Sequence, residues 1–116
     1  MPKQPTDPAA IARTARDAVE ALNHATGLAN IPAPATSATT QALLSLVQRL
    51  PQTVEQLADA VLFQAKRDGI RMDDGSDPIE AAIQVRAALL DARCELGAAA
   101  DSIQRAASHL FHMAAK

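Results

Sequence analysis

The chain has 116 residues with a formal net charge of −2, and 27 of its residues are alanine while only two are aromatic. This length suits one domain, and the near balance of 11 basic and 13 acidic side chains excludes the strongly basic surface of a typical nucleic-acid-binding domain. The single cysteine excludes an internal disulfide and a cysteine-rich zinc site. Large apolar residues are few, so a core of leucine, isoleucine and alanine is thin and gains from burial against a partner.

The N-terminal residues lack the apolar core of a signal peptide, and no stretch approaches the roughly 18 uninterrupted apolar residues of a membrane span. We therefore expect a cytoplasmic protein that does not cross a membrane. Residues 1–6 are expected to form a flexible arm.

A first helix is predicted from Asp7-Pro8, an N-cap residue followed by a proline at the first helical position, to Gly27. Arg13 and Arg16 are each followed four residues later by a carboxylate, a spacing that favours ion pairs with Asp17 and Glu20. One face carries an apolar stripe at the spacing of an amphipathic helix, formed by Ile11, Ala15, Ala18, Leu22 and Ala25.

Residues 28–38 contain two prolines and are expected to form an extended connector. A second helix is predicted after Thr39 and is interrupted at Pro51, and a third is predicted from about Thr53 to Gly69. The alternative is a single helix that is kinked at Pro51.

Residues 69–77 predict an exposed acidic loop, and Asp77-Pro78 repeats the helix-start signal. The last helix is expected over about 78–114, with Gly97 as its only interruption. Its apolar positions form two stripes that are rotated relative to each other, so the two halves are expected to face different neighbours or the helix to bend at Gly97. The first stripe is Ile79, Ile83, Ala87, Leu90 and Cys94, and the second is Leu96, Ala100, Ile103, Ala107, Leu110 and Ala114.

Together these elements predict an all-α fold, an antiparallel bundle of three to four helices with a long C-terminal helix, in one domain over residues 1–116. A last helix of this length outreaches its partners within the chain. We expect its unmatched part to pair with a second copy, most simply about a two-fold axis.

Arg86 and Arg93 are seven residues apart and fall near the middle of the first stripe of the last helix. One interpretation is that their stems cover apolar surface while their guanidinium groups reach water. The other is an ion pair at an interface, with Asp59 or Glu55 as the candidate partners, because a buried charge needs a partner.

Interface residues are also predicted from the second stripe and from the two aromatic side chains. Phe63 lies opposite the stripe of its own helix, where an exposed aromatic ring marks an interaction site. Phe111 lies near the last stripe and is expected in the core or in a dimer contact. The interface candidates are therefore Arg86, Arg93, Leu96, Ile103, Leu110, Phe111 and Phe63.

No metal, cofactor or catalytic site is predicted. His109 and His112 share one side of a helix, but this side faces away from the apolar stripe, which favours solvated histidines. Cys94 lies on the apolar stripe of the last helix and is interpreted as a small buried hydrophobe. The acidic residues of 73–77 lack the spacing of an EF-hand calcium loop.

The sequence therefore predicts a non-enzymatic helical interaction or assembly module that forms a homo-oligomer, with a dimer favoured over higher states, or binds another protein. The alternative is a small DNA-associated regulator that uses residues 53–71. Its start resembles the first helix of a helix-turn-helix, and Lys66, Arg67 and Arg71 supply a small basic cluster. No basic recognition helix follows, so we expect no nucleic-acid partner. A ligand or metal site inside the bundle is a third hypothesis, but it lacks inward-facing ligands.

Overall fold

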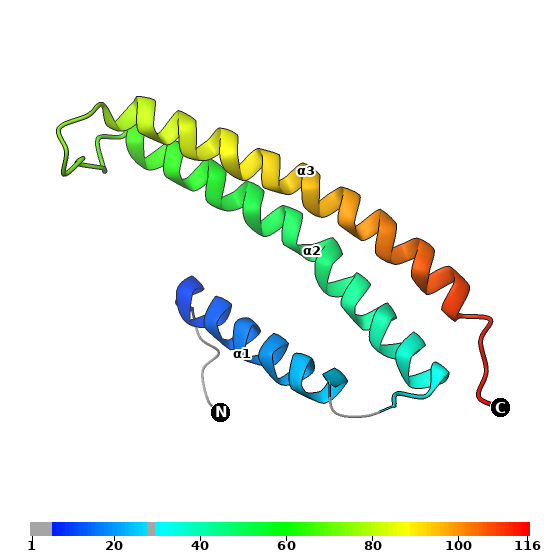
Figure 1. Cartoon of the computed structure of the whole chain (residues 1–116). Helices are drawn as coiled ribbons and strands as arrows, with labels where there is room; N and C mark the ends of the chain where they lie inside the picture. The colour runs from blue at the N-terminus through cyan, green and yellow to red at the C-terminus, as the bar shows by residue number, and fades with distance from the viewer. Residues whose placement is uncertain (1–5, 28–29) are drawn as a thin grey trace. The chain divides into compact units, whose positions relative to one another are not determined.

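The computed structural model describes residues 6–27 and 30–116. Over these residues the fold is all-α, with α1 at Pro8–Gly27, α2 at Ala33–Lys66 and α3 at Pro78–Leu110 (Figure 1). The predicted all-α class and the long C-terminal helix are confirmed. Two compact units are distinguished, Met1–Pro32 and Ala33–Lys116. A single domain over the whole chain stays a prediction, and the predicted arm at residues 1–6 lies, except for Thr6, outside the described residues.

The helix α1 begins where the sequence predicts, because the Asp7 carboxylate accepts a hydrogen bond from the Ala9 backbone N–H at 3.1 Å. It ends at Gly27, also as predicted. None of its residues is buried, and Ile11 on the predicted stripe is 49% exposed. The apolar stripe of α1 is thus present, but its side chains remain accessible.

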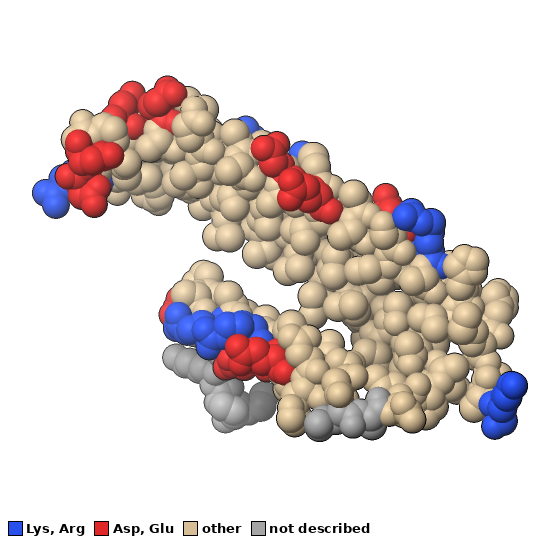
Figure 2. Space-filling model, viewed as in Figure 1, with Lys and Arg blue, Asp and Glu red and all other residues tan. Residues whose placement is uncertain are grey.

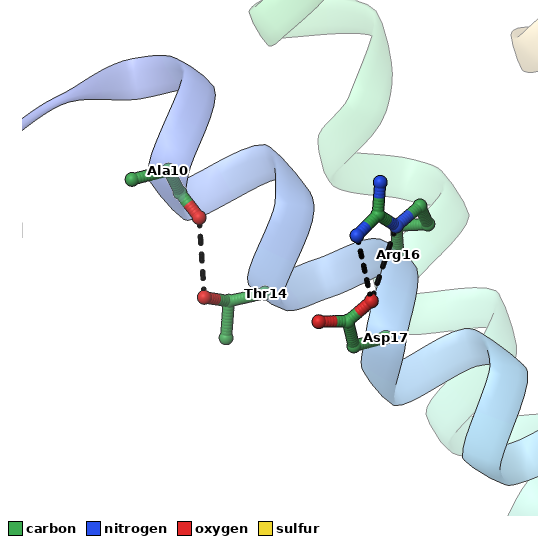
Figure 3. A network of polar contacts seen from close by, with 4 residues as sticks. All are labelled: Ala10, Thr14, Arg16 and Asp17. Atoms are coloured by element: carbon green, nitrogen blue, oxygen red, sulfur yellow. Dashed lines mark hydrogen bonds and ion pairs between the residues drawn. The ribbon is translucent and has the colours of Figure 1, made fainter.

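The polar contacts of α1 differ from the predicted pairs of residues four apart. The Arg16 Nη2 lies 3.0 Å from the Oδ1 of its neighbour Asp17, and the Thr14 hydroxyl donates to the Ala10 carbonyl at 3.1 Å (Figure 3). Arg13 approaches Asp7 at 3.9 Å. Each of these contacts is exposed, and exposed pairs contribute little to stability.

The helix α2 begins at Ala33, earlier than the predicted start after Thr39. Much of the predicted connector over 28–38 is therefore helical, and that prediction is wrong for residues 33–38; residues 28–29 lie outside the described part of the chain. Pro34 is compatible with the first turn of α2. The N–H groups of a first turn have no partner within the helix, so a proline there removes no hydrogen bond.

The chain between Ala33 and Lys66 forms one helix with Pro51 inside it, so the alternative of a single helix is correct. Pro51 lacks an N–H, which removes one hydrogen bond to the preceding turn. The apolar positions before and after Pro51 lie on one face that packs against α3. This packing stabilises α2 as a single helix despite the missing hydrogen bond. The predicted start near Thr53 is internal to α2.

The end of α2 is closed by a pair of backbone hydrogen bonds that overlap. The Gly69 N–H donates to the Gln64 carbonyl at 2.7 Å, and the Asp68 N–H donates to the Ala65 carbonyl at 3.3 Å. This is a Schellman motif, in which the left-handed residue is Asp68, with φ 61°, rather than the glycine that follows it.

An exposed loop joins α2 to α3, and the predicted N-cap of α3 is confirmed. The Asp77 carboxylate accepts a hydrogen bond from the Ile79 N–H at 3.1 Å, and Pro78 occupies the first turn. The helix runs through Gly97 without interruption and ends at Leu110, four residues before the predicted end at 114. No helix in the described residues is apolar over a length sufficient to cross a bilayer.

The helices α2 and α3 pack side by side as an antiparallel hairpin (Figure 1). The core between them is thin, as the composition predicts. Its buried apolar residues are all alanines, namely Ala58, Ala65, Ala82, Ala100 and Ala107.

Candidate functional site

One continuous seam joins α2 to α3. Along α3, one set of buried and half-buried positions follows alternating steps of four and three residues, the spacing of a coiled coil. These positions are Ala82, Arg86, Leu89, Arg93, Leu96, Ala100, Ile103, Ala107 and Leu110. The matching positions of α2 are Ser37, Thr40, Leu44, Val47, Pro51, Val54, Ala58, Val61 and Ala65.

This single seam corrects the prediction of two rotated stripes on the last helix. The predicted second stripe lies in the seam, except for Ala114, which follows the helix and is exposed. The predicted first stripe lies outside it, with Ile79 43% and Ile83 47% exposed. Cys94 also belongs to this outer group and is exposed, so its interpretation as a buried hydrophobe is wrong.

The two seam arginines form the predicted ion pairs with α2 of the same chain. The Arg86 Nε lies 3.4 Å from the Asp59 Oδ1, and the Arg93 Nη1 lies 3.2 Å from the Glu55 Oε1. The arginine side chains are 41% and 39% exposed, so their stems pack in the seam while their charged ends reach its edge. The residue order of these pairs also shows that the two helices are antiparallel.

A groove lies on the same flank of the hairpin as these ion pairs. Because both helices line it, it shows which edge of α2 lies beside which edge of α3. Gln41 of α2 and Gln104 of α3 both line it. Each of these glutamines occupies the position that directly follows a seam residue, as Glu55 does. The groove lies near the end of the hairpin opposite the loop, and its remaining lining is Leu44, Ala107, Ser108, Phe111 and His112.

The other flank of the hairpin carries large apolar side chains that the seam does not cover. On α2 these are Leu46, Leu50 and Leu57, which are 39%, 37% and 51% exposed, and on α3 Val85 is 44% exposed. Half-buried Leu43 belongs to the same stripe of α2. We call this surface the leucine face and define it as Leu43, Leu46, Leu50, Leu57, Ala60, Val85, Ala88, Ala92, Ala99 and Ala106.

The leucine face is almost free of charge. Between residues 36 and 64 of α2 and residues 78 and 106 of α3, Glu95 is the only charged residue on this flank. Its other polar residues are threonines, a serine and a glutamine. Figure 2 shows charged side chains of the hairpin at its loop end and along one edge. Contiguous apolar patches of this kind mark interaction surfaces in proteins.

The other predicted interface residues lie apart from the leucine face. Leu96, Ile103 and Leu110 are half-buried in the seam of their own hairpin. Phe63 is 58% exposed, and the Arg67 guanidinium lies 5.2 Å from the centre of its ring. Phe111 is 71% exposed, and its ring meets that of His112 edge to face with the ring centres 5.4 Å apart. Its predicted place in the core is therefore wrong, and its place in a dimer contact stays a prediction.

The described residues hold no group of three or more histidine, cysteine or carboxylate side chains placed to bind a metal ion. The two histidines do not share a helix, because His109 lies in the last turn of α3 and His112 follows it. In the acidic loop, the Ser76 hydroxyl and N–H donate to the Asp74 carboxylate at 2.6 Å and 3.0 Å. These two bonds lower the pKa of Asp74 below its ordinary value.

The region of the DNA-binding alternative takes a different conformation from a helix-turn-helix. Residues 53–66 are the second half of α2, and the next helix runs back along α2 instead of crossing it. Lys66, Arg67 and Arg71 lie at the loop end of the hairpin, where Asp68 and the acidic residues of 73–77 offset their charge.

Reasoning from the sequence did not identify the leucine face, although a signal was present. Leu43, Leu50 and Leu57 are separated by seven residues, which places them on one side of a continuous helix. The assumed break at Pro51 separated Leu57 from the other two and concealed the repeat. Comparison with known proteins adds no candidate site, because no family model, curated protein or solved structure matches this chain.

Proposed function

We propose that this protein is a non-enzymatic helical interaction module that associates with itself. The observation that supports the proposal is the leucine face, an apolar and nearly uncharged flank of the hairpin. Exposing such a surface to water is unfavourable, and its burial in a protein contact is the usual compensation.

The composition of the seam gives this proposal a physical basis. Alanine buries little apolar area, so the contact between α2 and α3 yields less stabilisation than a seam of leucines. Several large apolar side chains, among them Leu50 and Leu57, remain outside it. Burial of these exposed side chains against a partner would therefore add hydrophobic free energy that the contact between α2 and α3 does not supply.

Light scattering coupled to size-exclusion chromatography tests the proposal directly. The full chain, measured from about 1 to 100 μM, is expected to give twice its monomer mass of 12.2 kDa at the upper concentrations. A mass of one chain across this range, with helical circular dichroism retained, would contradict self-association.

A further inference from the structure

We infer that two copies of this chain bind each other through their leucine faces, about a two-fold axis that passes near Leu50. This inference rests on the proposed function and specifies its surface. It commits to a second copy of the chain as the occupant of the leucine face.

The leucine face extends over enough of the hairpin for a dimer contact of standard size. From residue 36 to residue 64, α2 is about 42 Å long, and two adjacent helices are about 20 Å wide. The product is a footprint of roughly 800 Å² on each copy, which is large enough to accommodate the area of about 800 Å² that one partner contributes to a standard specific interface.

The charge distribution favours an identical partner. A two-fold contact places each surface against itself, so any net charge on it is doubled and repels. The leucine face meets this condition, because Glu95 is its only charged neighbour between the stated residues. The charged groups of the seam, including Arg93 and Glu55, lie on the opposite flank.

The spacing of the leucines gives the contact a register. Leu43, Leu50 and Leu57 repeat every seven residues, which is about 10.5 Å along the helix. When two copies of α2 run antiparallel, Leu50 meets Leu50 across the axis, and Leu43 of one copy meets Leu57 of the other. The alanines that α3 contributes, such as Ala92 and Ala99, allow close approach beside this row.

The first experiment compares matched substitutions on the two flanks of the hairpin. Leu57→Asp changes the leucine face at a side chain that is 51% exposed, and Ile83→Asp changes the opposite flank at one that is 47% exposed. Light scattering on the full chain is expected to show that Leu57→Asp raises the dimer dissociation constant at least about 100-fold, since each dimer loses two apolar contacts. Ile83→Asp is expected to leave it within a few-fold of the parent chain.

The second experiment keeps the face apolar, so that it does not depend on a charged variant that fails to fold. In a Cys94→Ser background, Leu50→Cys places one thiol beside the proposed axis. Mild oxidation is expected to yield a disulfide-linked dimer, because the two thiols lie within reach of each other. Ile83→Cys in the same background is expected to remain mostly monomeric on a non-reducing gel.

The outcomes separate this inference from the proposed function. A parent dimer that survives Leu57→Asp, or that is lost only in Ile83→Asp, overturns the leucine face as the contact and leaves self-association intact. A parent chain that is monomeric at every concentration overturns both. Loss of the dimer in Leu57→Asp with helicity retained, together with cross-linking through Leu50→Cys, supports the contact.

Discussion

The Arg93 Nη1 lies 3.2 Å from the Glu55 Oε1, and this ion pair joins α3 to α2 across the edge of the hairpin seam. Arg93 occupies a seam position between Leu89 and Leu96, where a coiled coil usually places an apolar residue. Its stem fills the seam, and its guanidinium group reaches the edge. The same arrangement recurs one heptad earlier, at Arg86 and Asp59.

This ion pair is expected to contribute little to stability, because its side chains are 39% and 48% exposed. In a double-mutant cycle of Arg93→Gln and Glu55→Gln, we expect a coupling free energy of no more than about 1 kcal/mol, which falls as salt is added. Urea denaturation measures it, and exposed Asp91→Asn replaces Glu55→Gln in the control cycle. A coupling near 3 kcal/mol that is insensitive to salt would show a pair shielded from water.

Replacing the glycine inside α3 is expected to stabilise the protein. A Cβ built at Gly97 meets no atom within 4 Å, so Gly97→Ala gains the helix propensity of alanine, about 1 kcal/mol, without a clash. The Tm should rise by several degrees. Gly75→Ala is the contrasting variant: Gly75 has φ +77°, and its replacement should cost about 1 kcal/mol. A lower Tm for Gly97→Ala would indicate a role for a bend at this position.

Replacing a buried alanine of the seam by a larger side chain is expected to destabilise the hairpin. Ala58 has no exposed surface, so Ala58→Leu should force α2 and α3 apart and destabilise the fold by about 1 to 3 kcal/mol. Exposed Ala98→Leu on the outside of α3 is the control and should change stability by less than about 0.5 kcal/mol. The free energy of unfolding in urea measures both variants. Equal stability of the two would mean that the helices do not approach closely at Ala58.

The left-handed residue at the end of α2 offers a second route to stabilisation. Asp68 has φ 61°, a conformation that strains a residue with a Cβ, while glycine adopts it freely. We expect Asp68→Gly to stabilise the chain by about 0.5 kcal/mol, and Asp68→Val to destabilise it, because a β-branched residue resists this region most. Thermal unfolding followed by circular dichroism compares them. A stabilising Asp68→Val would contradict the positive φ.

The Asp74 turn makes a small part of the stability depend on pH. Hydrogen bonds from Ser76 lower the pKa of Asp74, so the folded loop favours the charged carboxylate. Its contribution is present above the ordinary aspartate pKa of about 3.9 and is lost as the pH falls through the lowered pKa.

Removing the hydroxyl is expected to move that titration upward. In Ser76→Ala, the pKa of Asp74 should rise toward its ordinary value, because the hydroxyl bond is the largest cause of the shift. A carbon-detected NMR titration of the Asp74 carboxyl measures it. Ser108→Ala, which removes a hydroxyl bonded to the Gln104 carbonyl, should leave that pKa unchanged. An unchanged pKa in Ser76→Ala would assign the shift to another contact.

The sequence by itself determined where α1 and α3 begin and where α1 ends, because these signals are local. Asp7-Pro8 and Asp77-Pro78 supply a capping carboxylate and a proline that lacks the N–H a first turn cannot use, and both start helices where predicted. The sequence also named Asp59 and Glu55 as candidate partners of Arg86 and Arg93, and the structure pairs Arg86 with Asp59 and Arg93 with Glu55.

Only the tertiary structure decided which face of each helix meets the other. Periodicity shows which residues share a face, but α3 has apolar residues on more than one face, and alanine suits both a seam and a surface. Packing selected the face that carries Ala82, Ala100 and Ala107, because these small side chains let the two helices approach closely at three levels of the seam. The arginines complete that face with their stems, while Cys94, Ile83 and Leu50 lie outside the seam.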